Sequence, residues 1–260
     1  MLDKKFIFIV GVHRSGTLLL YNIIRAQEEI SGLKRFSCLG TDEGQHCQDL
    51  LTTDANLGGA GNFSFHKDAH LTEDDYDSLN ITGVDLFNQW KPYWQHLGVD
   101  TFAEKSPVNI VRTRYYQKLF PNSYFILIMR HPIINAFATE KFLKGCKYSK
   151  GVCRFTNDHL INHWFKAHEI FFNDKKHLKN VLVVSYEQLI KEPLFVILNI
   201  QNFVGVNFNK KIFNVFDGNK KYFKKVKDSH YEYKEKVNKY GYDIKNLNKY
   251  PKIKELTYEI

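Results

Sequence analysis

The stretch FIFIVGVHRSGTLLL, residues 6–20, changes character at its centre, where an apolar run meets two glycines and several polar residues. The run Lys5–Val12 is almost continuously apolar, as is typical of a short strand buried on both faces of a sheet. After Gly16, apolar residues recur at helical spacing through Leu20 and Ile24. The sequence therefore predicts a strand that passes through a tight loop into a helix.

The loop between this strand and helix has the form of an anion site. Gly11 and Gly16 have the G-x-x-x-x-G spacing of a phosphate-binding loop, in which backbone amides and the following helix N-terminus hold the anion. The nucleoside-triphosphate version continues with Lys, whereas this chain continues with Thr17 and carries Arg14 inside the loop. The spacing alone is a weak signal, and we expect His13 to shape the loop. The candidate anion-binding residues here are Gly11, His13, Arg14, Ser15, Gly16 and Thr17.

Three more apolar runs are candidate strands: Thr101–Glu104, Ser123–Met129 and Leu182–Ser185. Prolines at positions 107 and 132 favour helix starts after the first two. Strands that alternate with helices predict an α/β fold with a mostly parallel central sheet and helices on both faces.

The residues that follow these strands converge on one kind of chemistry. Ligands of such sheets bind outside the carboxyl ends of the strands, where Lys105, Arg130 and Tyr186 follow the three runs above. With Arg14, this edge would carry three cations, which indicates an anion site. Nucleoside triphosphatases often close an apolar strand with a metal-binding Asp, whereas Arg130 stands there in this chain. We therefore expect no metal and a second, separate phosphate.

Length and charge limit the possible domain organisation of the chain. The 260 residues fit a single domain, 1–260, with a net charge of +9. Residues 210–260 hold 14 Lys against 7 Asp and Glu, so this basic C-terminal segment carries +7 and the rest of the chain +2. Such a segment suits an anionic ligand, and a solvated Lys-rich face fits equally well. Residues 31–97 are polar and Gly-rich without a sustained period, which predicts an acceptor-facing insertion over the crevice.

Targeting and cysteine patterns suggest a cytoplasmic protein. No apolar run approaches the ~20 residues that span a bilayer, and the first strand begins too early to leave room for a signal peptide. The four cysteines lack a C-x-x-C pair, so we expect no zinc site and four reduced thiols. A Cys146–Cys153 bridge would be plausible only in a secreted protein.

At this point the chain resembles sulfotransferases that use 3′-phosphoadenosine 5′-phosphosulfate (PAPS). GVHRSGT, residues 11–17, resembles their 5′-phosphosulfate loop, commonly R-S-G-T-T. AEKSP and LFPNSYFILIMRHP resemble the central block, in which the strand-ending Arg starts the 3′-phosphate motif, and VVSYEQLIKEP resembles a later block. DEGQH, GGAGNFSFHKDAHLTE, EKSP and HWFKAHEIF together resemble a bacterial-type branch. The matching blocks span about residues 5–193 in the family's order.

The resemblance implies a P-loop-containing sulfotransferase-like fold and assigns nucleotide contacts. Arg130 would bind the 3′-phosphate of PAPS and of its product PAP. Tyr186, which follows the last candidate strand, fits a nucleotide contact and a packed aromatic equally well. The family has a Ser eight residues beyond the Arg, where this chain has Ala138, so the adjacent Thr139 is expected to supply the hydroxyl.

The resemblance also implies metal-free transfer of a sulfonate to a hydroxyl or amine. Arg14 and Lys105 would stabilise charge on the leaving phosphate. A carboxylate or His after the first helix would take the acceptor proton, and of Glu43 and His46 we favour Glu43. The acceptor is expected to be a glycan or small hydroxylated molecule.

Two other function classes remain open. A P-loop kinase-like phosphoryl transferase is disfavoured by the missing loop Lys and strand-end Asp. A non-enzymatic anion or nucleic-acid binder would use the basic C-terminal segment, but no nucleic-acid module is visible, so we expect no nucleic-acid partner.

Overall fold

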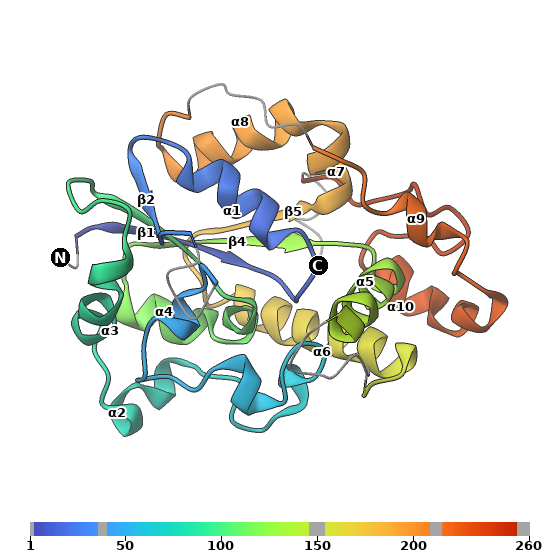
Figure 1. The fold of residues 1–260 in the computed structure, drawn as a ribbon, viewed down its shortest axis with the longest axis horizontal. Coiled ribbons are helices and arrows are strands. Elements are labelled where there is room, and N and C mark those ends of the chain that lie inside the picture. The colour runs from blue at the N-terminus through green and yellow to red at the C-terminus, as the bar shows by residue number, and fades with distance from the viewer. Residues whose placement is uncertain (1–2, 36–40, 146–153, 209–214, 254–260) are drawn as a thin grey trace.

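The computed structural model describes residues 3–35, 41–145, 154–208 and 215–253, built around one five-stranded sheet (Figure 1). The strands lie in the order β2-β3-β1-β4-β5, and every neighbouring pair is parallel. Their bounds are β1 Lys5–Val10, β2 Ile30–Gly32, β3 Thr101–Lys105, β4 Ser123–Met129 and β5 Val181–Ser185. The predicted parallel α/β sheet is confirmed, and the carboxyl ends of all five strands lie at one edge.

Helices cover both faces of the sheet, as predicted (Figure 1). Alternate strand residues point to opposite faces: Phe6 and Phe8 of β1 belong to one apolar cluster, and Ile7 and Ile9 to the other. The Phe6 face packs against α3 Gly83–Trp90, α4 Thr113–Leu119, α5 Pro132–Gly145 and α6 Asn157–Lys175. The Ile7 face packs against α1 Thr17–Arg25, α7 Tyr186–Lys191 and α8 Pro193–Val204. The remaining helices are α2 Tyr76–Leu79, α9 Lys220–Phe223 and α10 Lys234–Lys239.

The described part of residues 31–97 is more ordered than its composition suggested. Leu57, Phe63 and Trp90 are fully buried in the Phe6-side core. Helix α3 begins with a capping box in which Thr82 and Asp85 satisfy each other's backbone N–H groups. The segment is therefore part of the core as well as a candidate cover for the crevice, and its acceptor-facing role stays a prediction.

Cys47 departs from the expected thiol chemistry, because it is disulfide-bonded. The expectation of a reduced thiol is wrong at this position. The other three cysteines, and hence the considered Cys146–Cys153 bridge, lie outside the described residues. Within the described ranges, none of the helices combines the length and apolarity needed to cross a bilayer.

Candidate functional site

The loop from Gly11 to Thr17 follows β1 and contains positive φ angles. Glycine adopts such angles easily, whereas other residues do not. Gly16 has a φ of +105°, and a Cβ there would lie 2.6 Å from Cδ2 of Tyr186. Arg14 has a φ of +66° although it is not glycine, which costs roughly 1–2 kcal/mol for an L-residue. Ser15 is buried and its hydroxyl donates to Val12 O at 2.8 Å, so it fixes the loop's own backbone. The guanidinium of Arg14 is exposed, and its central carbon lies 5.6 Å from the centroid of the Phe142 ring.

Arg130 directly follows β4 and joins the loop to the C-terminal segment. Its Nη1 donates to Arg14 O at 2.8 Å, its Nη2 to Gly218 O at 3.0 Å, and its Nε to Asn219 Oδ1 at 2.7 Å. The guanidinium also lies over the ring of Tyr186, with its central carbon 4.7 Å from the ring centroid. Burial lowers the pKa of Arg130, but an Arg guanidinium starts so far above neutrality that it stays charged.

Tyr186 therefore holds Arg130 and the loop together. Its hydroxyl donates to Phe216 O at 3.1 Å and accepts from Gly218 N–H at 3.1 Å. The ring lies beside both Arg130 and Gly16 and is largely buried in the Ile7-side core. The predicted nucleotide contact of Tyr186 stays a proposal.

Lys105, at the end of β3, is paired with two carboxylates. Its Nζ lies 2.7 Å from Glu43 Oε1 and 3.7 Å from Asp42 Oδ1. Arg25 of α1 binds the other oxygen of Asp42 at 2.9 Å. The result is a compact alternation of two cations and two anions, in which Lys105 is neutralised.

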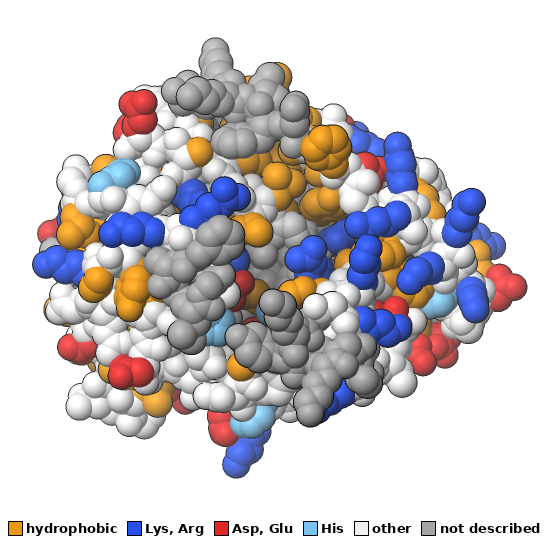
Figure 2. Space-filling model, in the orientation of Figure 1, with side chains coloured by type: hydrophobic (Ala, Val, Ile, Leu, Met, Phe, Trp, Pro, Cys, Tyr) orange, Lys and Arg blue, Asp and Glu red, His pale blue; other side chains and the backbone are white. Residues whose placement is uncertain are grey.

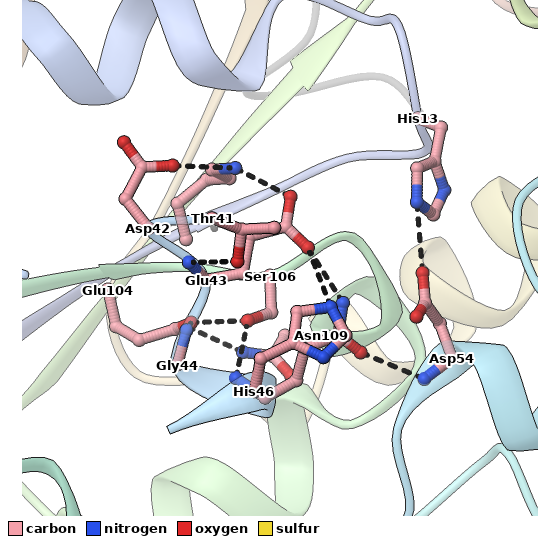
Figure 3. A network of polar contacts seen from close by, with 12 residues as sticks. His13, Thr41, Asp42, Glu43, Gly44, His46, Asp54, Glu104, Ser106 and Asn109 are labelled. Atoms are coloured by element: carbon pink, nitrogen blue, oxygen red, sulfur yellow. Dashed lines mark hydrogen bonds and ion pairs between the residues drawn. The ribbon is translucent and has the colours of Figure 1, made fainter. Parts of the chain in front are cut away.

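Glu43 and His46 lie together, as their spacing predicted (Figure 3). Glu43 Oε2 is 3.8 Å from His46 Nε2 and accepts a hydrogen bond from Gln45 Nε2 at 2.8 Å. Both side chains are partly exposed. Of the two candidate bases, Glu43 contacts Lys105 directly, and His46 lies beside Glu43.

Glu104, which precedes Lys105 in β3, is bound by hydrogen bonds from neutral groups. Its carboxylate accepts from Gly44 N–H at 2.8 Å, from Ser106 Oγ at 2.5 Å and from Asn109 Nδ2 at 2.6 Å (Figure 3). Burial raises the pKa of Glu104 to about 7, although the hydrogen bonds from Ser106 and Gly44 act in the opposite direction. The group thus sits near the midpoint of its titration at neutral pH.

His13 links the glycine loop to the segment that carries Glu43. Its Nε2 lies 2.9 Å from Asp54 Oδ2, and Asp54 N–H donates to Gln45 Oε1 at 2.8 Å (Figure 3). Burial alone would raise the pKa of Asp54, but the hydrogen bond and charge of His13 outweigh it and lower that pKa to about 2. Asp54 therefore fixes the His13 ring, and the expected role of His13 in shaping the loop stays a prediction.

Thr139 lies beside the loop. Its hydroxyl is 3.4 Å from His13 O, to which Asn135 Nδ2 also donates at 3.1 Å. Sequence reasoning missed Asn135, Asp54 and Asn219, because each is an ordinary polar residue far from the glycine loop along the chain. Only the pairing in three dimensions identifies them.

The face of the molecule drawn in Figure 2 is hollowed near its centre. Figure 2 shows Lys and Arg side chains at the edges of a depression near the centre of this face, and more of them over the C-terminal helices. Within the part of the chain that the structure describes, no three His, Cys, Asp or Glu side chains cluster as a metal site.

The comparisons with known proteins concern most of the chain. A family model described as "Sulfotransferase family" matches residues 7–210. The sulfotransferase from Alicyclobacillus acidocaldarius is similar with a TM-score of 0.52 and 14% identity, covering 90% of this chain and 94% of that one. Sulfotransferase STF9 from Mycobacterium avium gives 0.56 and 10%, covering 80% and 65%. STF1 from Mycobacterium tuberculosis H37Rv gives 0.52 and 14%, covering 80% and 69%. No curated protein matches.

At these identities the structural likeness concerns the fold alone. The family match carries more, because it runs from β1 through the strand ends that bear Lys105 and Arg130 to the segment after α8. The chain belongs to the sulfotransferase family.

Proposed function

We propose that the protein transfers the sulfonate of PAPS to a hydroxyl or amine group of an acceptor and releases PAP. The observation that carries this proposal is the environment of Arg130. The buried guanidinium binds only neutral oxygens among its hydrogen-bond partners in the described residues, one of which is the Arg14 carbonyl of the glycine loop. Because these direct hydrogen bonds carry no opposing charge, the guanidinium can still attract an anion beside the loop, which suits a nucleotide with two separate phosphates.

In this proposal the donor spans two anion sites. The 5′-phosphosulfate binds the amides of Gly11–Thr17 and the N-terminus of α1, and the 3′-phosphate binds Arg130. Thr139 supplies a hydroxyl nearby, and Tyr186 orients the guanidinium. Arg14 is the exposed cation closest in sequence to the loop amides, and it would meet the sulfonate and the leaving phosphate.

The ion pair of Lys105 and Glu43 suggests how proton transfer and leaving-group stabilisation are coupled. The acceptor oxygen forms a bond to sulfur while the bond from sulfur to the 5′-phosphate oxygen breaks, and the acceptor proton passes to Glu43. Protonation neutralises Glu43 and frees the charge of Lys105, which then stabilises the departing phosphate. His46 is the alternative base, 3.8 Å from the same carboxylate.

The first test is ligand binding. Saturating PAP at ~100 Kd should stabilise the fold by about 2.7 kcal/mol, measured as a thermal shift. ATP with Mg²⁺ and a DNA oligonucleotide are the comparison ligands. Stabilisation by ATP with Mg²⁺ but not by PAP would favour the kinase-like function, and stabilisation by the oligonucleotide alone would favour a nucleic-acid binder.

The second test is transfer. Radiolabelled sulfonate from PAPS should appear on at least one member of a panel containing 4-nitrophenol, small hydroxylated metabolites and unsulfated oligosaccharides. We propose that the acceptor is a glycan or small hydroxylated molecule, on the family resemblance alone. The rate should survive EDTA, because Arg130 stands where a metal-binding Asp would close β4.

A further inference from the structure

The segment that carries Glu43 is attached to the end of β3 through consecutive backbone groups (Figure 3). Gly44 N–H donates to Glu104 Oε1 at 2.8 Å, and a Cβ on Gly44 would lie 2.7 Å from that same oxygen. Gln45 N–H donates to Ser106 Oγ at 3.0 Å. The two backbone N–H groups directly after Glu43 are therefore both fixed by side chains at the end of β3.

Glu104 and Ser106 also bind each other, so they act as one support. Ser106 Oγ donates to Glu104 Oε1 at 2.5 Å while it accepts from Gln45. Asn109 Nδ2 donates to Glu104 Oε2 at 2.6 Å and fixes the other side of the carboxylate. All of these side chains are buried, and a hydroxyl that accepts one hydrogen bond and donates another has a single preferred orientation.

We propose that Glu104 and Ser106 are positioning residues that hold Glu43 against Lys105. The inference rests on the proposed function, in which Glu43 accepts the acceptor proton. Lys105 lies between the two positioning residues in the chain, so one short segment both fixes the backbone after Glu43 and supplies its ionic partner. A displacement of the base by about 1 Å would cost on the order of 100-fold in rate.

Three variants separate the two contacts. Ser106→Ala removes the acceptor of the Gln45 amide and leaves the Gly44 amide its partner. Glu104→Leu keeps a similar side-chain size and removes the acceptor of the Gly44 amide. Glu104→Gln keeps one acceptor oxygen, and its new amide can donate to Asn109 Oδ1, a buried oxygen without a hydrogen-bond partner, once the Asn109 amide turns over.

Hydrogen exchange of the Gly44 and Gln45 amides, followed by NMR, reports the contacts without any turnover. Ser106→Ala should speed exchange at Gln45 by about 10-fold, and Glu104→Leu should speed it at both amides. Transfer from PAPS to the acceptor identified in the panel should fall by about 10-fold and 100-fold, respectively. Glu104→Gln should stay close to the wild type in both measurements. PAP affinity should be unchanged in all three variants.

Glu187→Gln is the matched control. Glu187 is a second buried carboxylate, and it accepts from Asn219 Nδ2 at 2.8 Å on the Arg130 side of the site. Its substitution should weaken PAP binding and leave both amides as protected as in the wild type.

Protected amides in both Ser106→Ala and Glu104→Leu would overturn the proposal. So would a loss of PAP affinity that follows the loss of transfer, because it would indicate general collapse. If Glu104→Leu does not fold, Ser106→Ala decides alone. If the wild type sulfonates no acceptor, the proposed function fails, while the exchange rates still decide the positioning.

Discussion

Lys105 ends β3 and Arg130 follows β4, the two strands that flank β1 in the sheet, yet the partners of these two cations are of opposite kinds. Arg130 binds three neutral oxygens, two from backbone carbonyls and one from a side-chain amide. Lys105 binds two carboxylates, those of Glu43 and Asp42. A cation with neutral partners keeps its attraction for an anion, whereas a cation paired with carboxylates has lost most of it.

This difference in partners suggests that the two cations have different roles in the proposed reaction. Under the proposed function, the Arg130 end binds a phosphate of the donor before any reaction. The Lys105 end gains free positive charge only after one of its carboxylates takes a proton. We infer that the first end governs donor affinity and the second governs rate, and the predictions below test that division.

The largest expected effect is that of Glu43→Gln. The amide keeps the shape of the side chain but cannot accept the acceptor proton, so kcat should fall by about 10²–10⁴. PAP affinity, measured by calorimetry, should stay near the wild-type value. His46→Ala is the comparison variant and should cost much less. Full activity in Glu43→Gln with an inactive His46→Ala would make the histidine the base.

The strands and the glycine loop could be predicted because local sequence determines them. The continuous apolar runs of β1 and β4 predict buried strands. Gly16 marks the loop because a Cβ at this position would clash with the ring of Tyr186. β2 was missed, since three residues are too few to show a period. Helix α3 was missed although Thr82 and Asp85 form a capping box that the sequence does contain.

The partners of the two cations could not be predicted, because they come from distant parts of the chain. Lys105 and Glu43 are 62 residues apart, and Arg130 and Asn219 are 89 residues apart. The sequence placed the cations at strand ends through the geometry of parallel sheets. Which of them is neutralised depends on where the segments after α1 and α8 return, and no local pattern encodes that.

The second prediction uses the buried carboxyl of Glu104. Its pKa is raised from 4.5 in the unfolded chain to about 7 in the fold, so between these values the native state holds a proton that the unfolded state has lost. Stability should therefore fall as pH rises through this window, by on the order of 3 kcal/mol. Below pH 4.5 the group should contribute no such dependence.

Urea unfolding at pH 5 and pH 8 measures this effect. The wild type should lose stability relative to Glu104→Gln between the two pH values, because the amide does not ionise. Asp54 does not interfere, since its pKa of about 2 confines its contribution to more acidic solution. A difference between the two proteins that is independent of pH would show that Glu104 ionises as readily in the fold as in the unfolded chain.

The third prediction addresses the Arg130 end. Arg130→Ala should lower PAP affinity by about one to two decades, the range expected for a hydrogen bond to a charged group. Affinity for adenosine 5′-phosphosulfate, which lacks the 3′-phosphate, should scarcely change. Equal losses for both ligands would mean that Arg130 supports the loop through Arg14 O and does not bind the 3′-phosphate.

The smallest expected effect is that of Asn219→Ala, and it tests whether the C-terminal segment belongs to the donor site. Asn219 Oδ1 accepts from Arg130 Nε at 2.7 Å, and its amide donates to Glu187. Loss of one neutral acceptor should lower PAP affinity by about 3–10-fold, because the guanidinium keeps its charge but not its orientation. Asn199→Ala, which removes only a bond within α8, is the matched control. Since Asn219 does not touch the Lys105 cluster, kcat at saturating PAPS should remain that of the wild type. A fall in kcat with unchanged PAP affinity would contradict the inference that the Arg130 end governs donor affinity and the Lys105 end governs rate.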